Sequence, residues 1–199
     1  LTVDASDLPA SVEVTGSWKI DFPANWGAPS EADFRKLVSW SDDSDPGVKY
    51  FSGTATYHKT LAIPATMVGL GRRLYLELGD VEGIAQVKLN GKDLGVLWKP
   101  PYRLDITSVA QAGDNRLEVN VTNLWGNRQI GDAQLPEDCD WTDGGSLKAW
   151  PQWLLEGKPS PTGRFTFASW RNFKKDSPLF PSGLIGPVML RPSMEVEVQ

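Results

Sequence analysis

Two stretches of the sequence combine aromatic rings with planar polar side chains, which is the chemistry of a sugar-binding site. A sugar offers an apolar ring face to an aromatic side chain and a rim of hydroxyl groups to Asn, Asp or Arg. The residues that supply this chemistry are Trp98, Tyr102 and Arg103 in the first stretch and Trp125, Asn127, Arg128 and Asp132 in the second. The alternative is that Trp98 and Trp125 end their strands by packing into the core.

A third aromatic group lies in a polar stretch that is rich in Pro and Gly. It consists of Trp141, Trp150 and Trp153. Disordered segments are poor in aromatic residues, so this stretch is expected to be ordered. We predict these three residues as further carbohydrate-binding candidates, with the alternative that one or two of them only hold the loop in place.

Groups that could catalyse a reaction are few. The only histidine, His58, falls in the middle of an expected strand, and a Ser-His-Asp triad would have to use it. Glycoside hydrolysis needs only two carboxylates, so an acidic cluster is the better candidate. The carboxylates near Trp141 are Asp132, Glu137, Asp138, Asp140 and Asp143. A solvated acidic loop is the alternative, and we predict no catalytic residue in the chain.

Metal and cofactor sites have little support. No cluster of Cys and His exists, which argues against zinc. The acidic run 41–47 resembles half of a calcium loop but lacks its glycine position and terminal Glu. We expect no cofactor, and calcium at 41–47 stays open beside a plain charged loop.

The composition limits the class of protein. The chain has 199 residues, a formal net charge of -5 and one cysteine, so an intrachain disulfide is impossible and a nucleic-acid surface is not expected. No apolar run reaches the roughly 18 residues of a membrane span. The first residues contain neither a basic region nor an apolar region, so no signal peptide is expected in them.

Alternating apolar and polar residues predict strands in most of the chain. The clearest runs are 54–63, 74–78, 87–98 and 117–122. Asn90-Gly91 predicts a tight hairpin turn, and we expect the other strands to pack around the hairpin. Many short strands predict an all-β fold, a jelly-roll β-sandwich, rather than an immunoglobulin domain.

We expect one domain over 1–199. It has an irregular N-terminal part, 1–49, with short strands, and a jelly-roll core, 50–190, with a long loop at 123–163. Ser30 predicts the start of a short helix, and Phe165 and Phe167 predict a strand. Val196 and Val198 predict a closing strand or a tail.

Several motifs are similar to those of a known family. The segments Tyr-Phe-Ser-Gly-Thr-Ala-Thr-Tyr (50–57), Leu-Gly-Asp-Val (78–81), Val-Lys-Leu-Asn-Gly (87–91), Asp-Ile-Thr (105–107) and Gly-Asp-Asn-Arg-Leu (113–117) resemble the galactose-binding-like jelly-roll domain of family 2-type glycoside hydrolases. The segments 121–132, Leu135-Pro136 and 181–188 are similar to the C-terminal domain of bacterial enzymes that resemble family 106 α-L-rhamnosidases.

The resemblance implies a β-sandwich that accompanies a separate catalytic barrel. The catalytic acids of such enzymes belong to the barrel, which needs about 250 residues and cannot fit in this chain. It also implies a periplasmic or secreted location. We therefore predict a non-catalytic, carbohydrate-binding accessory domain of a glycoside hydrolase acting on plant-type polysaccharide, with carbohydrate and the barrel as partners. The alternatives are a structural domain that buttresses the barrel and, less favoured, a hydrolase that uses the carboxylates of 132–143.

Overall fold

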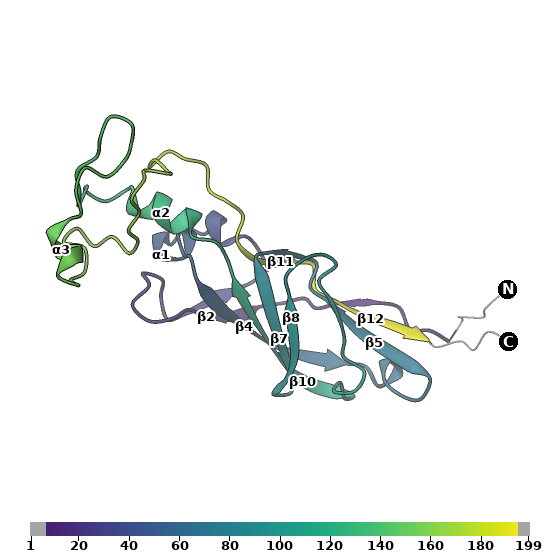
Figure 1. Cartoon of the computed structure of the whole chain (residues 1–199). Coiled ribbons are helices and arrows are strands. Elements are labelled where there is room, and N and C mark those ends of the chain that lie inside the picture. Colours follow the sequence, from purple (N-terminus) through teal and green to yellow (C-terminus); the bar gives the residue numbers. More distant parts are fainter. Residues whose placement is uncertain (1–6, 195–199) are drawn as a thin grey trace.

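Two antiparallel sheets form the body of the sandwich, as the alternating pattern predicts (Figure 1). The computed structural model describes residues 7–194. One sheet has six strands in the order β3-β2-β4-β10-β7-β8, and the other has four in the order β1-β12-β5-β9. A two-stranded pair, β11-β6, completes the set, and the all-β sandwich expected from the sequence is confirmed.

The elements are short except for two strands of ten residues, β4 and β10. The strands are β1 (Val12–Glu13), β2 (Trp18–Asp21), β3 (Glu31–Phe34), β4 (Thr54–Ile63), β5 (Arg72–Glu77), β6 (Asp80–Glu82), β7 (Ile84–Leu89), β8 (Lys92–Leu97), β9 (Arg103–Asp105), β10 (Gly113–Thr122), β11 (Gly183–Gly186) and β12 (Met189–Met194). The helices are η1 (Trp40–Asp42), α1 (Pro46–Lys49), η2 (Ala65–Met67), α2 (Gly126–Asp132) and α3 (Gln152–Leu155).

The pairing of β4 with β10 forms the middle of the six-stranded sheet. The two strands pair along their full length, from Thr54 opposite Thr122 to Ile63 opposite Gly113. Alternate residues of both strands are buried, as a strand with one face on the core requires. These two strands occupy the centre that the sequence assigned to the hairpin.

The predicted hairpin is correct in its turn but lies at an edge of the sheet. Asn90 and Gly91 have φ values of 52° and 80°, which a type I′ turn needs. Strand β8 pairs only with β7 within the described residues, and the pairing slips by one residue between Val87 and Lys88. This bulge is held by Asp93, whose carboxylate accepts hydrogen bonds from Gly95 N at 2.8 Å and from Gln86 Nε2 at 2.7 Å.

Buried residues from both large sheets form one hydrophobic cluster. Its aromatic centre joins Trp40, Tyr57 and Phe51, with the Trp40 and Tyr57 rings stacked at 6.2 Å between centroids and Phe51 edge-on to Trp40 at 5.4 Å. The Tyr57 hydroxyl accepts a hydrogen bond from Leu184 N at 3.0 Å, which ties β11 to β4.

Three expectations for local structure are wrong. The predicted helix after Ser30 is strand β3, because Glu31–Phe34 pairs with β2 and buries Phe34. The predicted strand at Phe165 and Phe167 is irregular, because Asp132 binds this backbone in place of a neighbouring strand. The expected long loop 123–163 contains helices α2 and α3. Val196 and Val198 lie outside the described residues.

The Tyr57 hydroxyl gives a direct test of how the sandwich is held. Tyr57→Phe leaves a buried backbone N–H of Leu184 without its acceptor, so we expect the free energy of unfolding to fall by roughly 1–3 kcal/mol. Urea denaturation measures it. Tyr75→Phe, at a half-buried ring, is the matched control and should change stability by less than about 0.5 kcal/mol. Equal stability of the two variants would contradict the assigned role.

Candidate functional site

Helix α2 is fixed to the end of the sandwich by buried polar side chains. Asn123 bonds Phe51 O and Gly53 N, both at 2.9 Å, where β10 ends and the chain enters the helix. The Ser52 hydroxyl donates to Leu124 O at 2.8 Å and accepts from Arg128 N at 3.1 Å. These bonds satisfy backbone groups that would otherwise be buried without partners.

The next turn of α2 carries a buried ion pair. Arg128 Nε lies 3.1 Å from Asp132 Oδ1, and both side chains are less than a tenth exposed. The other oxygen of Asp132 accepts from Phe165 N at 3.0 Å and from the N and Oγ1 of Thr166, each at 2.7 Å. Burial lowers the pKa of the Arg128 guanidinium, and the Asp132 carboxylate opposes that shift. The pair therefore fastens the returning chain at 165–166 to the helix.

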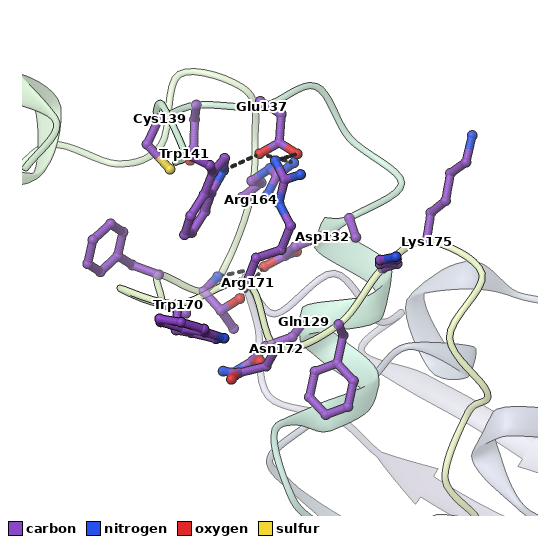
Figure 2. A pocket seen from close by; sticks show the side chains of 17 residues that line it. Gln129, Asp132, Glu137, Cys139, Trp141, Arg164, Trp170, Arg171, Asn172 and Lys175 are labelled. Carbon is purple, nitrogen blue, oxygen red and sulfur yellow. Dashed lines mark hydrogen bonds and ion pairs between the residues drawn. The ribbon is translucent and has the colours of Figure 1, made fainter. Parts of the chain in front are cut away.

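A cleft of about 240 Å³ opens beside this attachment, outside the sheets. One wall comes from α2 and residues 137–141, and the other comes from residues 164–175. Figure 1 shows α2 and α3 gathered at one end of the sandwich, with α3 farthest from the sheets. Figure 2 shows Trp141 and Trp170 on two sides of the cleft, with Arg171 beside them and Asn172 and Lys175 along its length.

Glu137 organises the upper wall of the cleft in Figure 2. Its carboxylate accepts from Trp141 Nε1 at 2.8 Å, pairs with Arg171 at 2.8 Å and lies 3.4 Å from Arg164. Arg171 also lies over the Trp141 ring, 5.2 Å from its centroid. The indole is thus fixed at its N–H and on one face.

A short antiparallel arrangement of backbone supports both tryptophans. Isolated bridges join Trp141 to Leu147 and Ser146 to Trp170. Trp170 is 53% exposed and Trp141 is half-buried, so part of each ring is open to a ligand. An aromatic ring held by backbone pairing loses little freedom when it binds.

The structure brings two of the ten predicted site residues, Trp141 and Asp132, into the cleft wall. Three predicted polar residues, Asn127, Arg128 and Asp132, are at least nine-tenths buried. Asn127 bonds the N and O of Phe180, at 2.9 and 2.7 Å, and the Ser182 hydroxyl. These three side chains bind the protein itself.

The predicted aromatic loop after β8 is separate from this cleft. Trp98 is 67% exposed, and Arg103 stacks on Tyr75 with 3.7 Å between guanidinium and ring centroid. The Tyr102 hydroxyl donates to Gly83 O at 3.1 Å. None of the three lines the cleft.

The remaining predicted tryptophans pack against other rings. Trp125 lies 5.4 Å from Trp26, between ring centroids, and is 47% exposed. Trp150 and Trp153 pack on Phe167, and Trp153 Nε1 donates to Asp138 O at 3.0 Å. They hold the loop around α3 together.

Sequence reasoning missed the second wall of the cleft. Its residues are Arg164, Trp170, Arg171, Asn172, Lys174 and Lys175. The pattern that predicts the other candidates, an aromatic residue beside planar polar residues, is also present in Trp170-Arg171-Asn172.

In the charged loop at 41–47, carboxylates accept hydrogen bonds from the loop's own backbone. Asp43 accepts from Asp45 N at 2.8 Å, and Asp45 caps α1 by accepting from Gly47 N at 2.7 Å. Over residues 7–194, no group of three or more His, Cys, Asp or Glu side chains is placed to hold a metal ion.

Comparison with known proteins identifies the family of this domain. Residues 42–149 match the model of the glycosyl hydrolase 2 galactose-binding domain-like family. The chain belongs to this family. The resemblance expected from the sequence motifs is confirmed. The match includes the first cleft wall and ends before 164–175.

Longer relatives contain a similar domain. A putative beta-glucuronidase of Formosa agariphila is 42% identical over 195 residues, which is 98% of this chain and 17% of that protein. The rhamnosidase of Novosphingobium sp. PP1Y has a TM-score of 0.72 and 35% identity, over 97% of this chain and 16% of that one. The beta-glucuronidase of Bifidobacterium dentium, at 24% identity and a TM-score of 0.59 over 93% of this chain and 30% of its own, shares the fold. The chain thus spans about a sixth of the length of the first two.

None of the helices between residues 7 and 194 is both long enough and apolar enough to span a membrane.

The buried ion pair predicts a large effect of one substitution. Asp132→Ala removes the partner of a buried guanidinium and the acceptor for residues 165–166, so we expect a loss of about 3–5 kcal/mol in the free energy of unfolding of this region. Hydrogen exchange at the Phe165 and Thr166 amides measures it. Asp140→Ala, at an exposed carboxylate, is the control and should leave the exchange unchanged.

Cys139 in the cleft wall predicts an unusual pH profile for alkylation. Burial raises the pKa of its thiol to about 11, and the carboxylates of Asp138 and Glu137 add to the shift. Because the thiolate is the nucleophile, the rate with iodoacetamide should rise about tenfold per pH unit from pH 8 to 10.5 without levelling. The alkylation rate of glutathione, whose thiol is fully solvated, should level off near pH 9 and serves as the control. A plateau below pH 9.5 in the folded protein would refute the assignment.

Proposed function

We propose that this chain is a non-catalytic carbohydrate-binding domain of a glycoside hydrolase, and that the sugar lies in the cleft between Trp141 and Trp170. The observation that carries the proposal is the pair of partly open indole rings held on opposite sides of one cleft. Asn172 and Arg171 line the same cleft and offer amide and guanidinium groups to sugar hydroxyls.

The carboxylates of the cleft support a binding role rather than a hydrolytic one. Asp132 is buried against Arg128, and Glu137 is shared among Trp141, Arg164 and Arg171. A catalytic carboxyl group has to face its substrate, and the oxygens of these two carboxylates are engaged by the protein's own donors. Catalysis in our proposal belongs to another part of a longer parent enzyme.

The relatives suggest which parent this is. One is named a rhamnosidase and another a putative beta-glucuronidase. We assign the parent enzyme to the hydrolysis of a plant-type polysaccharide that contains rhamnose or glucuronic acid, in the periplasm or outside the cell.

A second function, docking on the catalytic domain, is favoured by an apolar surface at the start of α2. A cavity of about 320 Å³ is lined by Leu124, Phe173 and Phe180, of which Leu124 is 84% and Phe180 51% exposed. Contiguous exposed apolar side chains mark interaction surfaces. Leu124→Asp separates the two functions, because it should prevent association with a separately expressed catalytic domain and leave glycan affinity unchanged.

Titration calorimetry with rhamnose-rich pectic polysaccharide tests the sugar-binding function. We expect binding that Trp141→Ala and Trp170→Ala each weaken about tenfold, because each removes one stacking ring. Trp98→Ala removes an exposed tryptophan that does not line the cleft and should retain the affinity. Loss of binding in Trp98→Ala alone would move the site to the loop after β8, and no binding by the unaltered chain would favour docking.

A further inference from the structure

The cleft carries a positive charge that its own carboxylates do not neutralise. Four basic side chains line it, Arg164, Arg171, Lys174 and Lys175, against the three acidic ones Asp132, Glu137 and Asp138. The whole chain has a formal net charge of -5, so this balance is the reverse of the rest of the molecule.

Each of the three carboxylates already has partners inside the protein. Asp132 is paired with Arg128, which does not line the cleft. Glu137 is paired with Arg171 and Arg164. Asp138 accepts from the Ser160 hydroxyl at 2.7 Å. Within residues 7–194, none of the three forms an ion pair with Lys174 or Lys175.

The two lysines are held at the cleft by their backbone and not by an acidic neighbour. Gln134 Nε2 donates to Lys175 O at 2.7 Å and also reaches Ile130 O, which fixes the segment to the end of α2. Lys174 N donates to the Ser177 hydroxyl at 2.9 Å. Neither ammonium group has an ion-pair partner within residues 7–194, and both side chains are exposed. Figure 2 shows Lys175 extending from the opposite end of the cleft from Trp170.

We propose that the cleft selects an anionic sugar residue, carrying a carboxylate or a sulfate, with Lys174 and Lys175 meeting the charge while Trp141 and Trp170 bind the ring faces. The proposal rests on the sugar-binding function above and adds its substrate class. A neutral sugar would stack on the two indole rings but would give the two lysine ammonium groups no charge to pair with. An anionic sugar gains attraction from the two ammonium groups, which lie closer to it than the charges behind the chain's net charge of -5 and are therefore screened less.

Paired polysaccharides that differ only in charge test this selection. Polygalacturonate is compared with its fully methyl-esterified form, and dextran sulfate with dextran, by calorimetry on the 199-residue chain. We expect at least one anionic member to bind about tenfold more tightly than its neutral partner. The pair that shows the preference identifies carboxylate or sulfate as the group recognised. The preference should shrink between 50 and 300 mM NaCl, because salt screens exposed charges.

A double variant connects the preference to the lysines. Lys174→Gln with Lys175→Gln should weaken the anionic probe about fivefold, as expected for two exposed ion pairs, and leave the neutral probe unchanged. Lys174→Arg with Lys175→Arg keeps both positive charges and should retain the affinity of the unaltered chain for the anionic probe. Lys92→Gln with Lys148→Gln removes the same charge from exposed positions outside the cleft and should have no effect.

The outcomes separate the two proposals. Equal binding of charged and neutral partners, or an unaltered preference in the double variant, overturns the anionic selection and keeps the sugar-binding function. Binding of single-stranded oligothymidylate as tight as that of the polysaccharides overturns it too, in favour of a nucleic-acid site. No binding of any polysaccharide overturns both.

Discussion

The buried pair of Arg128 and Asp132 determines where the chain after residue 164 returns to helix α2. Taking two charges out of water is expensive, and such a pair is stable only when further hydrogen bonds satisfy its remaining atoms. Here the backbone of Phe165 and Thr166 supplies them. The same contact that satisfies the carboxylate brings residues 164–175 back to α2, and the cleft is the space left between the two.

The sandwich could be predicted from the sequence because period-2 patterns are local. The runs in β4 and β10 alternate over ten residues each, and Asn90-Gly91 requires a left-handed turn whatever surrounds it. Strand β3 was missed because Phe34, Leu37 and Val38 have helical spacing, and pairing with β2 overrode that preference. The central position of β10 depends on contacts distant in sequence, which alternation does not encode.

The candidate site was predicted only in part for a related reason. Asn127, Arg128 and Asp132 have the right chemistry for binding hydroxyl groups, and burial turns the same chemistry inward. A polar side chain looks the same in a sequence whether it meets a ligand or a backbone amide. Trp170 and Arg171 lie some thirty residues beyond Trp141 in the chain, and their proximity follows from the bridges around Ser146.

The bulge in strand β8 has a consequence for how this domain behaves among other proteins. A flat edge strand presents a row of free N–H and C=O groups to which a foreign strand can add. The pairing of β8 with β7 slips between Val87 and Lys88, and Asp93 binds Gly95 N at the bulge, so this edge strand is bent and twisted instead of flat. The six-stranded sheet therefore ends in a poor template for intermolecular β-pairing. This protects a domain whose hydrophobic residues Val96 and Ile84 remain exposed beside that edge.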